Sequence, residues 1–309
     1  DFASSISSIQ IQRGVGTSTN GAGAFGGSIN VSTQKQSQAS KFKLSNSFGS
    51  YGTLKNSISF TTGRVGNHFE LNGNLSKIYS DGYIDRASSN LKGYFLQGSY
   101  YKDRTNIKFI AFGGHERTYQ AWYGLDQETL STNRKFNYAG MYFNDDGDQF
   151  FYDKQEDNYK QDHYQLIFNH KINPSWRANL TFHYTHGRGY YEEYNEDQNL
   201  SDYLIFDNNG EVISDLIRRK WLDNDFYGSL FNFIYEKSSS KLILGGTLNK
   251  YFGDHFGEVI WARNAGNSEI RHRYYDNYGN KEEFNLFAKF QYTFNDKLYA
   301  FVDLQNRNI

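Results

Sequence analysis

Regular alternation of apolar and polar side chains is the feature that most constrains what this chain can fold into. Over residues 176–186 every second residue is apolar and those between are polar. The apolar set is Trp176, Ala178, Leu180, Phe182 and Tyr184, and the polar set is Arg177, Asn179, Thr181, His183 and Thr185. A β-strand sends successive side chains to opposite faces of its sheet, so this pattern predicts a strand with one apolar and one polar face.

The same pattern recurs along most of the chain. Residues 284–294 alternate in the same way, with Phe287 interrupting the polar face. Further strands are predicted to begin near Phe42, Lys55, Phe69, Lys92, Asn106, Tyr164, Phe226, Lys241 and Leu298. Template matching therefore predicts about eleven strands after the opening segment.

The composition favours a particular kind of β-protein. The 309 residues include 26 Tyr, 26 Phe and 29 Gly but only one Pro, which suits many regular strands. The mean hydropathy is nevertheless −0.77, which is low for a chain so rich in aromatic residues. A transmembrane barrel reconciles the two properties, because only alternate residues face lipid while the others face a wet interior.

Other classes of protein receive little support. The net charge of −1 indicates no nucleic-acid partner. The absence of Cys excludes disulfides and thiolate metal sites. No apolar run reaches the length of a membrane-spanning helix, and no signal peptide is visible. The opening Asp-Phe-Ala is expected to be a mature or truncated start.

The predicted connections alternate between short and long. The short turns are 64–67, 102–104, 173–175, 237–241 and 295–297, and the long segments lie near 80–90, 115–160, 187–223 and 253–282. Short turns on one side and long loops on the other are the layout of outer-membrane barrels. A soluble, carbohydrate-binding β-sandwich stays open as an alternative, although sandwiches carry shorter loops and more Val and Ile.

The first 36 residues differ from the rest. Short strands are predicted over 6–12 and 28–33, on either side of a Gly-rich stretch over 14–27. A phosphate-binding loop would end in Gly-Lys-Ser/Thr and lead into a helix, and the sequence has neither feature here.

The order of motifs in this segment resembles the end of the plug domain of TonB-dependent receptors. The matching residues are Arg13, Gly14, Gly26, Gly27, Ile29, Asn30 and Val31. Val15 and Asn20 stand where that family usually has Pro and Tyr, and Gln12 replaces a frequent acidic residue. The Ser-Asp-Gly-Tyr string at 80–83 also resembles a first-loop motif of these receptors.

The resemblance implies an all-β fold, an antiparallel transmembrane β-barrel preceded by the C-terminal piece of a plug domain. Residues 1–36 would be that piece, and residues 37–309 would be the N-terminal half of a barrel of about 22 strands. The implied partners are outer-membrane lipid, an inner-membrane energising complex (TonB) reached through a missing upstream region, and a small-molecule nutrient.

The implied function is active nutrient uptake at the bacterial outer membrane, most often of a ferric siderophore. Uptake of cobalamin, haem or an oligosaccharide by the same architecture stays open. So does a passive outer-membrane adhesin or structural barrel, although the plug-like segment argues against it.

Two aromatic groups are candidate ligand contacts, because aromatic side chains offer a large contact area at low entropic cost. One group lies in a predicted loop over 117–125 and the other in a predicted loop after His186. They are Tyr119, Trp122 and Tyr123, and Tyr190, Tyr191 and Tyr194. Packing within the loops or at the membrane interface is the competing interpretation, and it is the favoured one.

The sequence predicts no enzyme, metal site or cofactor. Residues 144–148 faintly resemble a calcium loop but lack the downstream Glu, so a solvated turn is expected. His183 and His186 are three residues apart on a strand and would point to opposite faces. If the apolar rows face lipid, the inward side chains that could contact a plug are Glu70, Asn72, Asn74, Gln97, Arg177, Asn179, Thr181, His183, Lys289 and Gln291.

Overall fold

One large antiparallel sheet makes up most of the protein. The structure is a computed structural model, and it describes residues 5–14, 16–20, 26–33, 37–206, 210 and 212–309. The sheet's strands are β3 (Lys41–Gly49), β4 (Thr53–Thr61), β5 (Phe69–Ser80), β6 (Ser89–Lys102), β7 (Thr105–Tyr119), β10 (Glu156–Lys171), β11 (Trp176–Asn199), β12 (Ile213–Lys237), β13 (Ser240–Ala262), β14 (His272–Asn295) and β15 (Leu298–Asn308).

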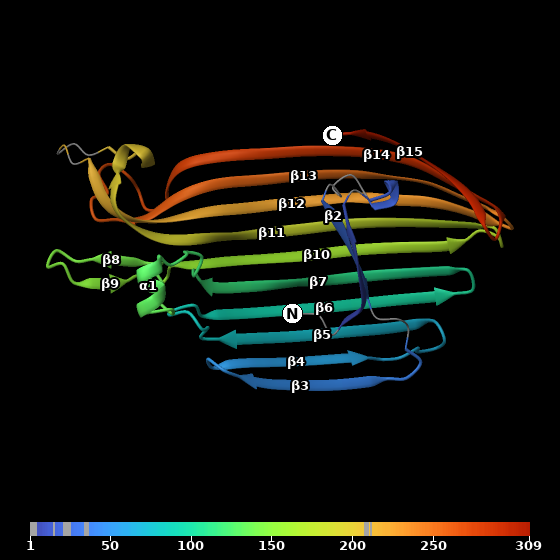
Figure 1. The fold of residues 1–309 in the computed structure, drawn as a ribbon, viewed down its shortest axis with the longest axis horizontal. Coiled ribbons are helices and arrows are strands. Elements are labelled where there is room, and N and C mark those ends of the chain that lie inside the picture. The colour runs from blue at the N-terminus through green and yellow to red at the C-terminus, as the bar shows by residue number, and fades with distance from the viewer. Residues whose placement is uncertain (1–4, 15, 21–25, 34–36, 207–209, 211) are drawn as a thin grey trace.

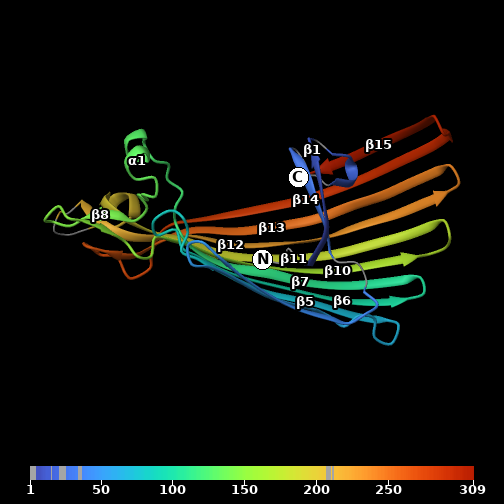
Figure 2. The same cartoon turned by 60° about the horizontal axis from the view of Figure 1, so that its bottom comes forward.

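These strands form one 11-stranded sheet in sequence order from β3 to β15 (Figure 1). The predicted number of strands is therefore confirmed. The sheet is curved and does not close, so β3 and β15 are its two edges (Figure 2). Each strand pairs antiparallel with the next strand of this sheet along the chain. β7 pairs with β10 across the connection that contains β8 (Met141–Phe143) and β9 (Gln149–Phe151).

In a soluble protein the apolar face of a sheet is buried and the polar face is exposed. Here the apolar face is exposed and the polar face is buried. On one face, large apolar side chains are exposed: Phe42 is 72% exposed, Leu75 61% and Phe182 51%. On the other, polar side chains are buried: Glu70 is 3% exposed, Asn74 1% and Gln97 2%. Within the described residues no second sheet covers the Phe and Leu rows, because the other two sheets have only two strands each. The arrangement is that of a barrel wall rather than a sandwich.

Along the strands, the apolar residues form a band that aromatic residues border at both of its limits. Tyr164 and Tyr184 stack at one limit of this band with ring centroids 6.2 Å apart. The Tyr184 hydroxyl donates a hydrogen bond of 2.7 Å to Asp225, just beyond the apolar band. Trp176 and Tyr235 meet at the opposite edge with centroids 5.1 Å apart. The interval from Trp176 to Tyr184 matches the roughly 9–11 residues with which a barrel strand crosses a bilayer.

Four strands continue far beyond this band. β11, β12, β13 and β14 have 24, 25, 23 and 24 residues. The prediction of long loops over 187–223 and 253–282 is therefore wrong for most of both segments, which leave only 200–212 and 263–271 outside strands.

Oppositely charged residues meet across the strands of this extension. Glu192 and Arg219 form an ion pair at 2.7 Å, and Glu193 and Arg218 form one at 2.9 Å. All four belong to directly paired positions of β11 and β12. A small apolar core lies at the end of this extension and consists of Leu200, Tyr203, Ile205, Leu216 and Val259.

The connection between β7 and β10 is an ordered substructure. It contains helix α1 (Gln127–Thr132) and a hairpin of β8 (Met141–Phe143) and β9 (Gln149–Phe151). The Asn137 side-chain amide donates to the carbonyls of Asp85 and Gln120, at 3.0 and 2.9 Å. The bond to Asp85 joins the connection to the loop between β5 and β6, and the bond to Gln120 lies within the connection.

The opening segment folds as a hairpin on the concave side of the sheet (Figure 2). It comprises β1 (Ile6–Arg13), the short helix η2 (Ser18–Asn20) and β2 (Gly27–Thr33). The two short predicted strands are confirmed. Ser18 N–H donates to the Asp303 carboxylate at 3.2 Å, and Ser37 N–H, just after the hairpin, donates to the Glu70 carboxylate at 3.0 Å. The segment is thus attached near both edges of the sheet, on β15 and on β5.

The helices give a separate finding. Among the residues that the structure describes, no helix is long and apolar enough to cross a membrane.

Candidate ligand-binding site

The concave face carries a hollow of about 840 Å³ over β7 and β10 to β13. It follows from strand parity, because the side chains that line it alternate with the exposed apolar row. Its lining includes Gln161, Gln165, Thr181, Asn224 and Tyr251. The Tyr251 hydroxyl donates to the Asn224 side chain at 2.9 Å, and both remain beside the hollow as hydrogen-bonding groups.

Two histidines stand in the wall of this hollow. His163 stacks on Phe112 with centroids 4.4 Å apart and bonds the Thr185 hydroxyl at 2.8 Å. His183 bonds the Asn249 side chain at 3.0 Å. His186 lies on the opposite face, where it contacts Asp225 at 3.0 Å, as the predicted alternation requires. No group of three or more potential metal ligands occurs in the part of the chain that the structure describes.

A second hollow, of about 350 Å³, lies further along the same strands, beyond the level of the apolar band. Tyr159, Tyr191, Lys220 and His255 line it together with Glu116 and Asp157. Burial raises the pKa of Asp157, and burial together with the Asp157 charge raises the pKa of Glu116. At this level, which we call the mouth, the concave face therefore presents aromatic rings, a cation and two carboxyl groups.

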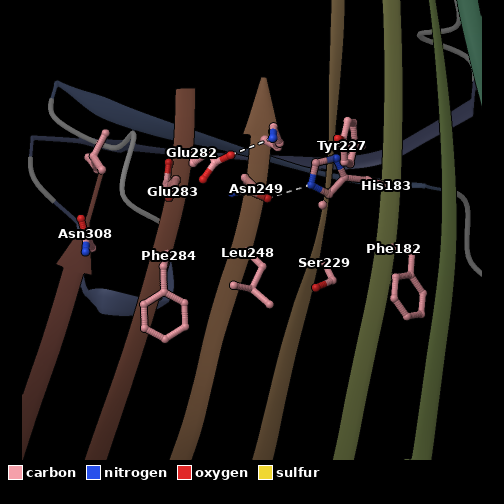
Figure 3. A pocket seen from close by; sticks show the side chains of 13 residues that line it. Phe182, His183, Tyr227, Ser229, Leu248, Asn249, Glu282, Glu283, Phe284 and Asn308 are labelled. Atoms are coloured by element: carbon pink, nitrogen blue, oxygen red, sulfur yellow. Dashed lines mark hydrogen bonds and ion pairs between the residues drawn. The ribbon is translucent and has the colours of Figure 1, made fainter. Parts of the chain in front are cut away.

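A third hollow lies on the outward face, away from the two hollows of the concave face. It has a volume of about 830 Å³ and includes Phe182, Leu248 and Phe284 (Figure 3). Ser229 is the small residue on the apolar row among them. Lys250 and Glu282 close its upper end with an ion pair of 2.7 Å.

The first predicted aromatic group divides in the structure. Tyr119 is buried, and its hydroxyl donates to the carbonyls of Ala139 and Tyr152 at 3.1 and 2.8 Å. Tyr119 thus packs within the connection between β7 and β10. Trp122 and Tyr123 are 58% and 53% exposed, so both remain available to a ligand.

The second predicted group lies on a strand, which corrects the prediction of a loop. Tyr190, Tyr191 and Tyr194 all belong to β11, whose ladder with β12 continues through them. Tyr191 shares the parity of His183 and faces the second hollow. Tyr190 shares the parity of Tyr184 and faces outward, where the Arg219 guanidinium lies 4.3 Å from its ring. Tyr194 packs on Tyr142 with centroids 4.6 Å apart.

Only one pair joins the two predicted groups. Trp122 and Tyr191 meet edge to face, with ring centroids 5.9 Å apart and planes at 77°. The Lys220 ammonium group lies 5.5 Å from the centroid of the Tyr191 ring. The structure therefore assembles a smaller aromatic site than the six predicted residues.

The plug-like residues close the hairpin. Gly14 has φ of +77°, and its N–H donates to the carbonyl of Gly26 at 3.0 Å. Arg13 pairs with Gly27, and a Cβ on Gly27 would lie 2.8 Å from the Gln12 carbonyl oxygen. Asn30 pairs with Gln10 in the same ladder. Val15 and residues 21–25, which belong to the same motif, lie outside the described residues.

The sequence alone missed His163, Tyr159 and Tyr251 as parts of the concave site. Each lies on a strand that was predicted, at least in part. Gln165 is the direct partner of His183, which places His163 at the next inward position of β10. The parity of His183 was the available signal, but the register between strands was needed to use it.

Comparison with solved structures gives close agreement of fold at low identity. The ferric-catecholate import receptor Fiu from E. coli K12 matches 93% of this chain with a TM-score of 0.62 and 12% identity. BauA, the ferric preacinetobactin receptor from Acinetobacter baumannii, matches 97% with a TM-score of 0.64 and 11% identity. The copper transporter OprC matches 96% with a TM-score of 0.67 and 13% identity.

The chain spans less than half of each of these proteins, namely 47% of Fiu, 49% of BauA and 41% of OprC. No protein-family model matches the sequence, and no curated protein matches it. The agreement therefore concerns the fold: an open part of a barrel with a hairpin on its concave side. This chain has the fold of the β-barrel of TonB-dependent receptors, over about half the length of such a receptor.

Proposed function

We propose that this chain belongs to an outer-membrane receptor that imports a small nutrient, with a ferric siderophore as the substrate class. The observation that carries the proposal is the combination of an exposed apolar wall with a polar concave face that holds a hairpin. An exposed apolar wall suits lipid, and a polar interior suits a water-soluble solute. A hairpin across that interior suits gated rather than free passage.

The domain assignment belongs to this proposal. Residues 1–36 are assigned to the end of a plug and residues 37–309 to the first part of the barrel. Outer-membrane lipid is then the partner of the apolar face. An inner-membrane energising complex is the partner that would move the plug.

Ligand capture is assigned to the mouth of the concave face. Trp122, Tyr123 and Tyr191 offer aromatic surface there, and Lys220 offers a positive charge beside them. A bulky organic chelate with negative oxygens matches both features. Gln161, Asn224 and Tyr251 lie deeper on the concave face, where they would hydrogen-bond a polar solute during passage.

The siderophore class is also supported by the similar structures. Fiu and BauA are described as receptors for ferric-catecholate import and for ferric preacinetobactin. Copper transport, the role named for OprC, suits this chain less well. Copper(I) favours sulfur ligands, and the sequence has no Cys and one Met.

Growth and uptake assays test the proposal. A strain that lacks the gene is expected to grow poorly with iron supplied as one ferric siderophore, and to recover with the intact gene. A Trp122→Ala/Tyr191→Ala variant should reduce uptake about tenfold or more, since two aromatic contacts are lost. Tyr278→Ala is the control, because that exposed ring lies on the outward face of β14 and lines neither hollow of the concave face.

The same assays separate the alternatives. Recovery on cobalamin, haem or an oligosaccharide instead of iron would replace the substrate class and keep the architecture. Normal growth of the deletion strain on every source would contradict nutrient uptake and favour a passive barrel.

A further inference from the structure

Basic side chains form a continuous row across five neighbouring strands. Lys77 on β5 pairs with Lys92 on β6, and Lys92 pairs with His115 on β7. His115 pairs with Lys160 on β10, and Lys160 pairs with Arg188 on β11. We call Lys77, Lys92, His115, Lys160 and Arg188 the basic row. Since neighbouring strands lie about 4.8 Å apart, the row is roughly 20 Å long.

The basic row lies on the outward face. Lys77 has the parity of Leu75, Lys92 that of Tyr94, and Arg188 that of Tyr184. Lys77, Lys92, Lys160 and Arg188 are all exposed, and His115 is half-buried. These side chains therefore point away from the concave site and have no part in ligand passage.

The row follows the edge of the apolar band. On β6 the basic residue is the next outward position after Tyr94, and on β11 it is the second outward position after Tyr184. Tyr94 and Tyr184 are the aromatic residues that border the band on these strands. Both donate to carboxylates at this level, Tyr94 to Asp162 at 2.8 Å and Tyr184 to Asp225 at 2.7 Å.

Counter-charges accompany only one end of the row. Lys160 pairs with Asp162 at 2.9 Å, and Arg188 pairs with Asp223 at 3.3 Å. Within the described residues, neither Lys77 nor Lys92 has an ion-pair partner. Like charges directly opposite each other on a sheet are destabilising, so the Lys77–Lys92 pair costs stability unless an anion lies between them.

We propose that the basic row binds the phosphate groups of lipids with a net negative charge, in the leaflet nearest the long extensions of β11 to β14. This inference rests on the membrane insertion in the proposed function. Lipid chains that cover the exposed Phe and Leu rows would place their headgroups at the edge of the band, where the row lies. Ammonium groups are well suited to phosphate as mobile point charges. The row would thereby fix a ring of anionic lipid against β5 to β11.

Lipid binding by the purified full-length protein tests this inference. The protein in dodecyl maltoside micelles is titrated with diphosphoryl lipid A, and bound lipid is counted by native mass spectrometry. Lys77→Gln/Lys92→Gln is expected to weaken binding about 25-fold, since each basic residue near an anionic lipid surface contributes roughly a fivefold factor. Added salt should weaken binding to the unaltered protein as well.

Lys102→Gln/Lys297→Gln is the matched control. It removes the same charge at the opposite, short-turn end of the strands and should leave the affinity unchanged. Equal loss of affinity in both variants would overturn the inference in favour of non-specific attraction. Phosphatidylcholine that competes as well as diphosphoryl lipid A would also overturn it, because net negative charge would then be irrelevant.

The outcome is independent of transport. Heat-modifiable migration in gels reports whether each variant is folded, and both substituted pairs are exposed. Unchanged lipid A affinity in a folded Lys77→Gln/Lys92→Gln variant would refute lipid binding by the basic row and would leave the proposal of nutrient uptake intact. Failure of the uptake assays would refute the proposed function without altering a measured lipid affinity.

Discussion

Asp215 is a single carboxylate that joins β12 to β11 and to the residue directly after β13, at the far end of the extension. It lies on β12 and is 9% exposed. It accepts hydrogen bonds from the Tyr194 hydroxyl at 2.8 Å, from Asp197 N–H at 3.1 Å and from the Arg263 guanidinium at 2.8 Å. Burial alone would raise the pKa of Asp215, but these three donors outweigh it and hold the pKa below the ordinary value of 3.8.

We therefore predict a pH-dependent local opening at this site. A carboxylate with a lowered pKa stabilises the folded form above its ordinary pKa of 3.8, and that contribution is lost as the pH falls through the lower folded value. Asp215→Asn should mimic the acid state at neutral pH. It should cost about 1–3 kcal/mol locally, because hydrogen bonds to a charged group are lost. Protection factors of the Asp197 and Arg263 amides in hydrogen exchange measure the effect.

Asp145→Asn provides the control for that prediction. Asp145 also contacts Arg263, at 3.1 Å, but its side chain is 89% exposed. An exposed ion pair contributes little, so the amides should keep their protection. Equal opening in both variants would mean that neutralising the charge of Arg263, and not the buried position of the Asp215 carboxylate, keeps this site closed.

The sequence did not determine which way the individual tyrosines of residues 187–199 point. The composition of 187–199 identified Tyr190, Tyr191 and Tyr194 as exposed aromatic residues near the mouth. It did not separate Tyr191, which faces the concave site, from Tyr190, which faces outward. The two orientations can be told apart only if a continuous strand runs through this region. The charged residues Glu192 and Glu193 interrupt the apolar–polar alternation, so the sequence did not indicate that strand.

At the scale of the strand, the two faces of the sheet place side chains in different environments, which are the apolar band on one face and the polar concave side on the other. Leu180 lies near the middle of the apolar band on β11, between Trp176 and Tyr184. The adjacent Thr181 faces the concave hollow. Two neighbouring residues therefore offer a matched test of the two environments.

Leu180→Arg is expected to destabilise the membrane-inserted protein by about 2–4 kcal/mol, because a charge then faces hydrocarbon. Thr181→Arg should cost much less, since the concave face is polar and hydrated. Urea unfolding in phospholipid vesicles gives both values. A larger loss for Thr181→Arg than for Leu180→Arg would contradict the assignment of the two faces.

Strands were predictable where their side chains alternate between apolar and polar, and less so beyond. β5, β11 and β15 begin at or within a residue of their predicted starts. β12 and β14 begin at Ile213 and His272, well before the predicted positions near Phe226 and Phe284. Outside the apolar band both faces are polar, so alternation disappears. Ion pairs such as Glu193–Arg218 then hold the ladder, and they are visible only once the register is known.

At the scale of the whole molecule, the sequence predicted the number of strands and the two short opening strands, but not that these two strands pair as a hairpin or how the hairpin is attached. The attachment uses Glu70 on β5 and Asp303 on β15, which lie far apart in the sheet. Glu70 was predicted to face inward and could contact a plug, whereas Asp303 was not singled out. Curvature of the sheet brings both carboxylates toward the same hairpin, and curvature is a property of twist and register rather than of composition.

Neutralising these two carboxylates should loosen the hairpin one attachment at a time. Glu70→Gln replaces a charged acceptor by a neutral one, which binds a backbone N–H about half as strongly. The Ser37 amide should then exchange about fivefold faster, and Asp303→Asn should do the same for the Ser18 amide. Thr61→Val is the control, since it removes a 3.4 Å bond to Glu70 without touching the hairpin. If neither amide responds while the barrel stays folded, the two carboxylates do not hold the hairpin, and its position on the concave face must depend on contacts elsewhere.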